Sequence, residues 1–223
     1  MLKKDNQSGG EISSKNWNWH IRQHKSQTLK RYSLRNSGRK SHGENIVEDQ
    51  LRMTRHGLKN LPRLQCPDGY HIRTYQKGDE THWAQIMDRA FVDKGRTAKD
   101  TYTNVINQPD FDPNGFYFVI HKGVQIGTAC AWKQWIHGKP NGYIDMLAVL
   151  PEHTGHKLGK WLTLSVLYYF KAKDIKHVIL DTDDFRLPAI KNYLNLGFVP
   201  DYLRENHVRR WENVFQKLGL LEK

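Results

Sequence analysis

The stretch LAVLPEHTGHKLGKWL, residues 147–162, carries the strongest indication of how this chain folds. It begins as an apolar strand, turns at a proline, passes through a loop with two glycines and continues as an amphipathic helix. In this order the free backbone N–H groups of the loop and of the first helical turn aim at one point, where the helix dipole adds positive potential. An anion, most naturally a diphosphate, is the expected occupant.

Cationic or donor side chains stand in the same loop, namely His156, Lys157 and Lys160. They strengthen the expectation of a bound anion. A loop with two glycines before a helix is also typical of an ordinary capped turn, so the stretch taken alone leaves both interpretations open.

Upstream of this stretch, the pattern of apolar and turn residues predicts helices and strands in alternation. We expect strands at 69–73, 116–120, 125–136 and 143–149, with tight turns at Lys122-Gly123 and Asn141-Gly142. One helix follows Asp79, its predicted N-cap, and buries Trp83, Ile86, Met87 and Ala90; a second covers about 98–106. The last three strands form an antiparallel meander.

Downstream, the period changes to that of a helix, which runs to about Lys173, and a buried strand follows at 178–182. Ile190, Tyr193 and Leu194 form a second helical stripe, and Gly197 stands where a helix C′ glycine belongs. A short strand begins at Phe198, and Val208, Trp211, Phe215 and Leu218 predict a C-terminal helix. The fold class is therefore α+β, a mixed, mostly antiparallel sheet with helices on both faces.

Two motifs resemble those of the GNAT acetyltransferase superfamily. The loop is similar to its acetyl-CoA loop, Arg/Gln-x-x-Gly-x-Gly/Ala, with Thr154 at the Arg/Gln position, Lys157 at the middle glycine and Gly159 at the last position. The stretch PAIKNYLNLGF, residues 188–198, is similar to the second signature, an Ala, a Tyr four residues later and then Gly-Phe. The resemblance covers about residues 70–200 and implies the GNAT fold.

The resemblance implies direct transfer of an acetyl group from acetyl-CoA to an amine, without a covalent enzyme intermediate and without a metal. The residues that it places on the cofactor are Leu147, Ala148, Val149, Thr154, Gly155, His156, Lys157, Leu158, Gly159, Lys160, Arg186, Ala189 and Tyr193. Arg186 replaces an Asn that commonly contacts the pantetheine arm. By the same analogy the Tyr193 hydroxyl protonates the departing thiolate; alternatively, Tyr193 is a core aromatic.

A base is needed because an amine with a pKa near 10.4 must lose its proton before it attacks. Asp145 is the first candidate, and Asp181 and Asp183 on the next strand are the alternatives. Asp184 is assigned instead to capping the helix that begins near Arg186.

Residues 1–60 are interpreted as a basic, largely flexible extension and residues 61–223 as the catalytic domain with its C-terminal helix. The extension carries 13 Lys and Arg against 5 Asp and Glu, which is eight of the twelve net positive charges of the 223-residue chain. Basic and aromatic residues such as Trp17 and Trp19 alternate within it, as in a contact with nucleic acid or another anionic partner. This signal is weaker than the alternative, in which the segment is a solvated tail or packs its two tryptophans on the domain.

No stretch approaches the roughly 18 apolar residues that span a bilayer, and the N-terminus lacks an apolar secretory segment, so we expect no membrane insertion and a cytoplasmic location. Cys66 and Cys130 are expected to be reduced structural thiols.

Residues 61–223 loosely resemble the acetyltransferase halves of mycothiol synthase-like bacterial proteins. The alternative to an enzyme acting on a small-molecule or peptide amine is a non-catalytic GNAT-fold module that binds acyl-CoA or an anionic partner. Neither the acceptor nor the oligomeric state follows from the sequence.

Overall fold

The computed structural model describes residues 50–91, 95–136 and 138–221. They belong to two compact units: a sheet unit of residues 50–183 and 188–201, and a second unit that includes residues 184–187 and the chain from 202 onward. The proposed anionic contact of the extension falls on residues 1–49, outside the described residues.

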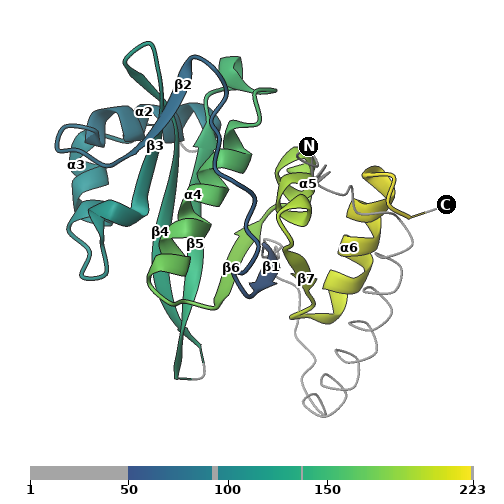
Figure 1. The fold of residues 1–223 in the computed structure, drawn as a ribbon. Coiled ribbons are helices and arrows are strands. Elements are labelled where there is room, and N and C mark those ends of the chain that lie inside the picture. Colours follow the sequence, from purple (N-terminus) through teal and green to yellow (C-terminus); the bar gives the residue numbers. More distant parts are fainter. Residues whose placement is uncertain (1–49, 92–94, 137, 222–223) are drawn as a thin grey trace, which may run out of the picture. The chain divides into compact units, whose positions relative to one another are not determined.

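The sheet unit is built on one mixed sheet (Figure 1), in which the described strands are ordered β2-β3-β4-β5-β6-β1-β7. The strands are β1 (Leu51–His56), β2 (Tyr70–Thr74), β3 (Phe116–His121), β4 (Val124–Ile136), β5 (Lys139–Val149), β6 (His177–Thr182) and β7 (Val199–Asp201). Neighbours are antiparallel except β5 and β6, which are parallel. The predicted fold class, α+β with a mostly antiparallel sheet, is confirmed.

Strand β1 corrects the predicted domain boundary at residue 60. It pairs with β6 on one side and β7 on the other, and the side chains of Leu51 and Met53 are fully buried. The alternation of Leu51 and Met53 with Arg52 and Thr54 has the period of a strand with one buried face. The boundary was wrong because the surrounding basic composition masked this short apolar pattern.

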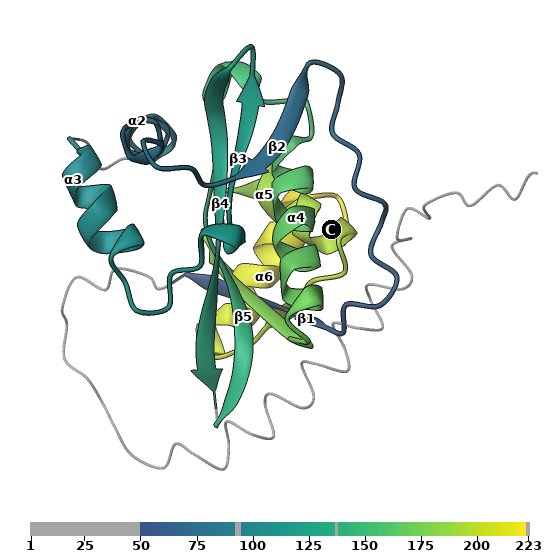
Figure 2. The ribbon, with the colours of Figure 1, turned by 60° about the vertical axis from the view of Figure 1, so that its left-hand side comes forward.

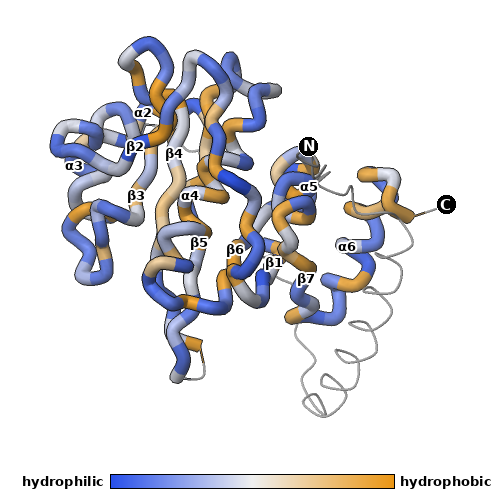
Figure 3. Tube along the Cα trace, in the orientation of Figure 1, coloured by the Kyte–Doolittle hydropathy of each residue, from blue (hydrophilic) through white to orange (hydrophobic). Residues whose placement is uncertain are grey.

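Helices cover both faces of the sheet within this unit (Figure 2). The helices and short helical turns are α2 (Glu80–Ala90), α3 (Ala98–Thr101), η1 (Tyr102–Ile106), η2 (Pro113–Gly115), η3 (Pro151–His153), α4 (Leu158–Ala172), α5 (Leu187–Asn195) and, in the second unit, α6 (Glu205–Lys217). Helices α2 and α3 lie on one face, where Trp83 packs against Phe116. Helices α4 and α5 lie on the other, and β4 and α4 supply long hydrophobic runs to the core (Figure 3).

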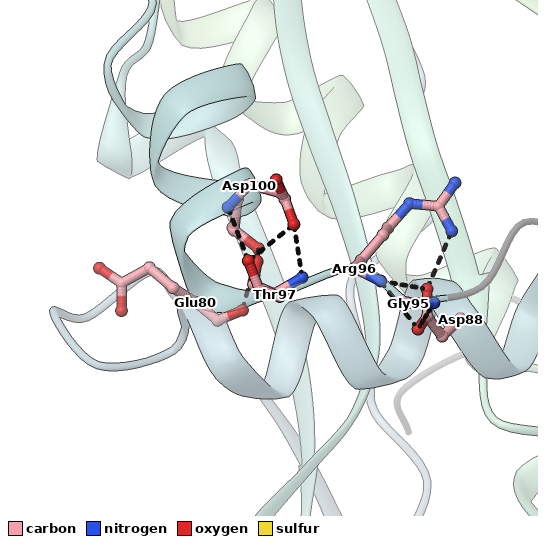
Figure 4. Close-up of polar contacts among 7 residues, drawn as sticks. Glu80, Asp88, Gly95, Arg96, Thr97 and Asp100 are labelled. Atoms are coloured by element: carbon pink, nitrogen blue, oxygen red, sulfur yellow. Dashed lines mark hydrogen bonds and ion pairs between the residues drawn. The ribbon is translucent and has the colours of Figure 1, made fainter.

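Polar contacts hold α2 and α3 together (Figure 4). The Asp88 carboxylate accepts hydrogen bonds from the backbone N–H groups of Gly95 (2.7 Å) and Arg96 (3.1 Å), and Thr97 and Asp100 form a capping box at the start of α3. The Thr101 hydroxyl donates to the Glu80 carbonyl oxygen (3.0 Å). The two helices thus form one layer on this face.

Asp79 does not cap α2 with its side chain, contrary to the prediction. The carboxylate is buried and accepts two hydrogen bonds from Arg73 and one from the Gln125 side chain. A buried carboxylate is stabilised most by a guanidinium that binds both of its oxygens, and β2 brings Arg73 within reach.

The turn predicted at Asn141-Gly142 is also wrong, because both residues lie inside β5. Gly142 is needed there for packing: a Cβ at this position would lie 2.7 Å from the Phe170 ring of α4. Gly197, in contrast, is the predicted helix C′ residue. It has φ +80°, and the Phe198 N–H bonds back to the Tyr193 carbonyl oxygen, as in a Schellman motif.

In the second unit, α6 confirms the predicted C-terminal helix, and Trp211 and Phe215 stack in its buried face. The carboxylate of Asp184 forms an ion pair with Arg210, whose Nε donates at 3.0 Å. Its predicted role as cap of α5 is therefore replaced by this ion pair, which stabilises the ionised carboxylate and lowers the Asp184 pKa.

Candidate active site

Strands β5 and β6 separate in the middle of the sheet. They pair only from Gly142 to Ile144 on β5 and from Val178 to Leu180 on β6, although β5 continues to Val149 and β6 to Thr182. Beyond this point the backbone N–H and C=O groups on the facing edges of β5 and β6 have no hydrogen-bond partners in the other strand. Such groups need water or a ligand as partner.

A β-bulge lies where the strands separate. Thr128 and Cys130 of β4 face Ala148 and Asp145 of β5, so β5 holds one extra residue between them. Met146 takes a φ of +54°, unusual for a residue with a side chain, and its N–H donates to the Asp145 carboxylate at 2.7 Å. Beyond the bulge Ala148 and Val149 still pair with β4, whereas the opposite edge of Leu147, Ala148 and Val149 no longer pairs with β6.

The Asp145 carboxyl is half-buried on the face of the sheet that carries α2, together with its cross-strand partner Cys130. Burial raises the Asp145 pKa above its usual range, the hydrogen bond from Met146 opposes this, and the nearby Asp181 carboxylate raises it further. Burial, with Asp145 adding to it, raises the pKa of the Cys130 thiol well above its usual value. A carboxylate with a raised proton affinity next to an opening of the sheet can accept a proton from a reacting group.

The loop from Gly155 to Gly159 presents backbone donors. Within the described part of the chain, the N–H groups of these five residues form no hydrogen bond. Gly155 and Lys157 both have positive φ, +85° and +58°, and a Cβ added at Gly159 would meet nothing within 4 Å. Lys157 therefore adopts the left-handed conformation that glycine usually supplies, which preserves the N–H array in front of α4.

The side chains of the loop differ in their contacts. Thr154 donates to the Pro151 carbonyl oxygen (2.8 Å), and Nδ1 of His156 lies 3.3 Å from the His153 carbonyl oxygen, so both are held by the loop itself. The Lys160 ammonium lies 4.8 Å from the centre of the Trp161 ring, and Lys157 is exposed. Leu158 is buried and anchors the first turn of α4.

Tyr70 of β2 and His121 of β3 support this loop, and the sequence did not indicate them. The Tyr70 hydroxyl lies 3.2 Å from His153 Nδ1, and the Tyr70 ring stacks on His121. They come from segments more than 30 residues away and share no motif, so no local signal could have found them.

The second motif lies beside the first. Asn192 of α5 donates to the Thr163 hydroxyl of α4 at 3.5 Å, and Thr163 donates to the Gly159 carbonyl oxygen at 2.7 Å. Ala189 is half-buried, and the buried Tyr193 ring packs edge-on to Phe198. The structure therefore brings the loop and the Tyr193 motif to adjacent helices. Arg186 belongs to the second unit, where its guanidinium lies over the Phe185 ring.

The other two candidate bases have partners. Arg52 binds Asp181 through two hydrogen bonds of 2.8 and 2.9 Å, and the Tyr143 hydroxyl donates to the same carboxylate at 3.3 Å. Asp183 accepts a hydrogen bond from the Gln50 side chain at 3.0 Å. Sequence reasoning missed Arg52 and Tyr143; the period-2 pattern around Arg52 is the signal that could have placed it on a strand.

Comparison with known proteins places this geometry in a family. The model of the acetyltransferase (GNAT) family matches residues 81–198, and the chain belongs to this family. The match includes the bulge, the loop and the Tyr193 motif.

The curated relatives are named mycothiol acetyltransferases. Those of Thermomonospora curvata and Thermobispora bispora are 34% and 31% identical to this chain, over 62% and 66% of its length. The matches cover 47% and 52% of the relatives, so the chain spans about half of their length.

Among solved structures, a GCN5-related N-acetyltransferase from Sphaerobacter thermophilus matches with a TM-score of 0.54 at 20% identity, covering 69% of this chain and 50% of that one. A GCN5-related N-acetyltransferase from Kribbella flavida matches with a TM-score of 0.50 at 17% identity, covering 71% of this chain and 57% of that one. At this identity the likeness concerns the fold, which is the predicted GNAT fold.

Within the described ranges, no three His, Cys, Asp or Glu side chains are grouped so that they could hold a metal ion. No helix in the same ranges is long and apolar enough to cross a membrane.

Proposed function

We propose that this chain transfers an acetyl group from acetyl-CoA to an amine. The observation that carries the proposal is the opening between β5 and β6, which leads directly into a loop of free N–H groups at the start of α4. Family membership and the adjacent Tyr193 motif support it. An anionic diphosphate suits the N–H groups from Gly155 to Gly159, and the exposed Lys157 adds a positive charge.

The pantetheine arm would run along the unpaired edge of β5, where Leu147, Ala148 and Val149 offer backbone N–H and C=O groups in place of a neighbouring strand. A backbone N–H at this edge would polarise the thioester carbonyl, since fixed donors stabilise the developing oxyanion. Thr154, His156, Leu158 and Lys160 then shape and hold the loop. Ala189 and Tyr193 would flank the thioester end.

Asp145 is the proposed general base. Of the three candidate carboxylates it is the one without an ion pair or a side-chain donor in the described part of the chain, and burial raises its proton affinity. The amine gives its proton to Asp145, directly or through water, and its nitrogen attacks the thioester carbonyl carbon. The C–S bond then breaks, and the thiolate takes a proton from the Tyr193 hydroxyl. Small-molecule or peptide amines are the proposed acceptors.

The test combines cofactor binding with turnover. Titration calorimetry with CoA should show one site per chain, and CoA at 100 times its Kd should stabilise the protein by about 2.7 kcal/mol. Release of free thiol from acetyl-CoA should depend on added amine. Absence of CoA binding by folded protein would refute the proposal. CoA binding without amine-dependent thiol release from any acceptor would instead support the non-catalytic binding module.

A further inference from the structure

Four charged residues form a row across the sheet beside the opening. Asp181 of β6 is the register partner of Arg52 on β1, and Arg52 is in turn the partner of Asp201 on β7. Asp145 follows Ile144, whose partner Leu180 precedes Asp181, so Asp145 continues the row on β5. We call these residues the Asp145 row: Asp145, Asp181, Arg52 and Asp201. All of them are half-buried.

The charges of the row are not balanced. Arg52 is bound through both of its hydrogen bonds to Asp181, so the two middle residues neutralise each other. Asp145, at one end, accepts one backbone hydrogen bond. Asp201, at the other, accepts a 3.5 Å hydrogen bond from the Thr54 hydroxyl and is also attracted by the Arg52 charge. Neither end carboxylate has an ion pair with a described residue. The row therefore offers one available carboxylate at each end.

Three further features point to a ligand on this face. The unpaired edges of β5 and β6 border the row at Asp145. On the same face, two residues from Cys130, the Thr128 hydroxyl is fully buried and has no hydrogen-bond partner in the described part of the chain. Register partners Trp132 and Tyr143 add half-buried aromatic surface next to Asp145, and such rings attract cations.

We propose that the acceptor is a di- or polyamine, of which one nitrogen is acetylated at Asp145 while a second, charged nitrogen binds Asp201. The proposal deepens the proposed function and rests on it. Three strand spacings of about 4.8 Å would place the Cα atoms of the two ends about 14 Å apart, and the separation of β5 from β6 at Asp145 makes the distance longer than this. The neutral pair Arg52–Asp181 between them suits the uncharged stretch of a linear amine. The reacting nitrogen must be neutral, whereas the distant one stays protonated and is selected by charge.

The experiment compares acceptors that differ by one amino group. The kcat/KM of acetylation is measured for α,ω-diamines of increasing length and for the monoamines of the same lengths, for example 1,8-diaminooctane and octylamine. The diamine should exceed its monoamine at least about tenfold at the best length, as expected for a charged hydrogen bond. In Asp201→Asn this ratio should fall to near one while monoamine turnover is unchanged. Asp174→Asn, which neutralises an exposed carboxylate outside the row, is the matched control and should keep the full ratio.

Equal turnover of diamines and monoamines by the wild-type chain would overturn the proposal without touching the proposed acetyl transfer. If CoA binds but no amine is acetylated, the proposed function fails, and diamine binding to the CoA complex is then measured by calorimetry. Binding of 1,8-diaminooctane that Asp201→Asn abolishes would still support the row as an amine site; absence of binding would overturn it.

Discussion

The Asp145 carboxyl combines a proposed catalytic role with a cost to stability. Its pKa is raised in the folded chain, chiefly by burial, so folding favours the protonated form and the ionised form is destabilising at neutral pH. Asp145→Asn keeps an oxygen for the Met146 N–H and removes the charge. We expect this variant to unfold at a higher urea concentration at pH 7.5, with a gain of about 1.4 kcal/mol for each unit by which the pKa is raised. The gain should shrink as the pH falls through the raised pKa. An unchanged midpoint, with Asp174→Asn as the control, would contradict this.

The same substitution should abolish most of the activity. General base catalysis is typically worth about 10² to 10⁴ in rate, so kcat/KM should fall by at least about 100-fold. In the wild-type chain kcat/KM should decline on the acid side through a pKa above the ordinary carboxyl value of about 3.9. If the pH dependence of kcat/KM were the same in the variant as in the wild-type chain, another group would be the general base.

A substitution at Tyr193 distinguishes a catalytic role of its hydroxyl from a packing role of its ring. Tyr193→Phe keeps the ring that packs on Phe198 and removes the hydroxyl. If the hydroxyl protonates the leaving thiolate, kcat should fall at least tenfold, a moderate effect because a thiol with a pKa near 8.5 leaves tolerably unassisted. CoA affinity by calorimetry and the melting temperature should stay nearly unchanged. Full activity would leave Tyr193 as a core residue and make water the proton source.

At the scale of elements, the loop before α4 depends on Lys157 in a left-handed conformation. This conformation destabilises a residue with a side chain by roughly 1 kcal/mol relative to glycine. Lys157→Gly should therefore be more stable than Lys157→Ala in urea unfolding by up to about 1 kcal/mol, less the entropy of the glycine in the unfolded chain. Both variants lose the ammonium and should weaken CoA equally. Equal stability of the two would show that the loop relaxes around any side chain.

The elements that sequence periodicity predicted well are those with a complete local signal. Helix α4, for example, shows its apolar stripe within 15 residues. The positive φ at the end of α5 requires only that Gly197 is a glycine. The Asn141-Gly142 turn failed because glycine also serves close packing, here against Phe170, and sequence does not separate the two uses.

At the scale of the whole chain, β1 makes truncation sensitive to a few residues. Removal of residues 1–49 spares β1, and we expect a cooperative urea transition and CoA binding to remain. Removal of residues 1–60 deletes the strand between β6 and β7 together with the buried Leu51 and Met53, so the sheet should lose its cooperative transition. Circular dichroism during urea unfolding measures both. Cooperative unfolding of the shorter chain would show that the rest of the sheet folds without β1.

The sequence by itself determined the fold class and located the loop proposed to bind a diphosphate and the Tyr193 motif, because each depends on residues that are neighbours along the chain. The tertiary structure decided which of the candidate carboxylates have side-chain partners and which residues share a face with Asp145. Arg52 and Asp181 are 129 positions apart, and Asp79 meets Gln125 across 46. Such pairings follow from strand order and register, which are set by burial of the whole sheet rather than by any local pattern. For the same reason, the opening between β5 and β6 and the unbalanced ends of the Asp145 row become visible only once the strands are placed side by side.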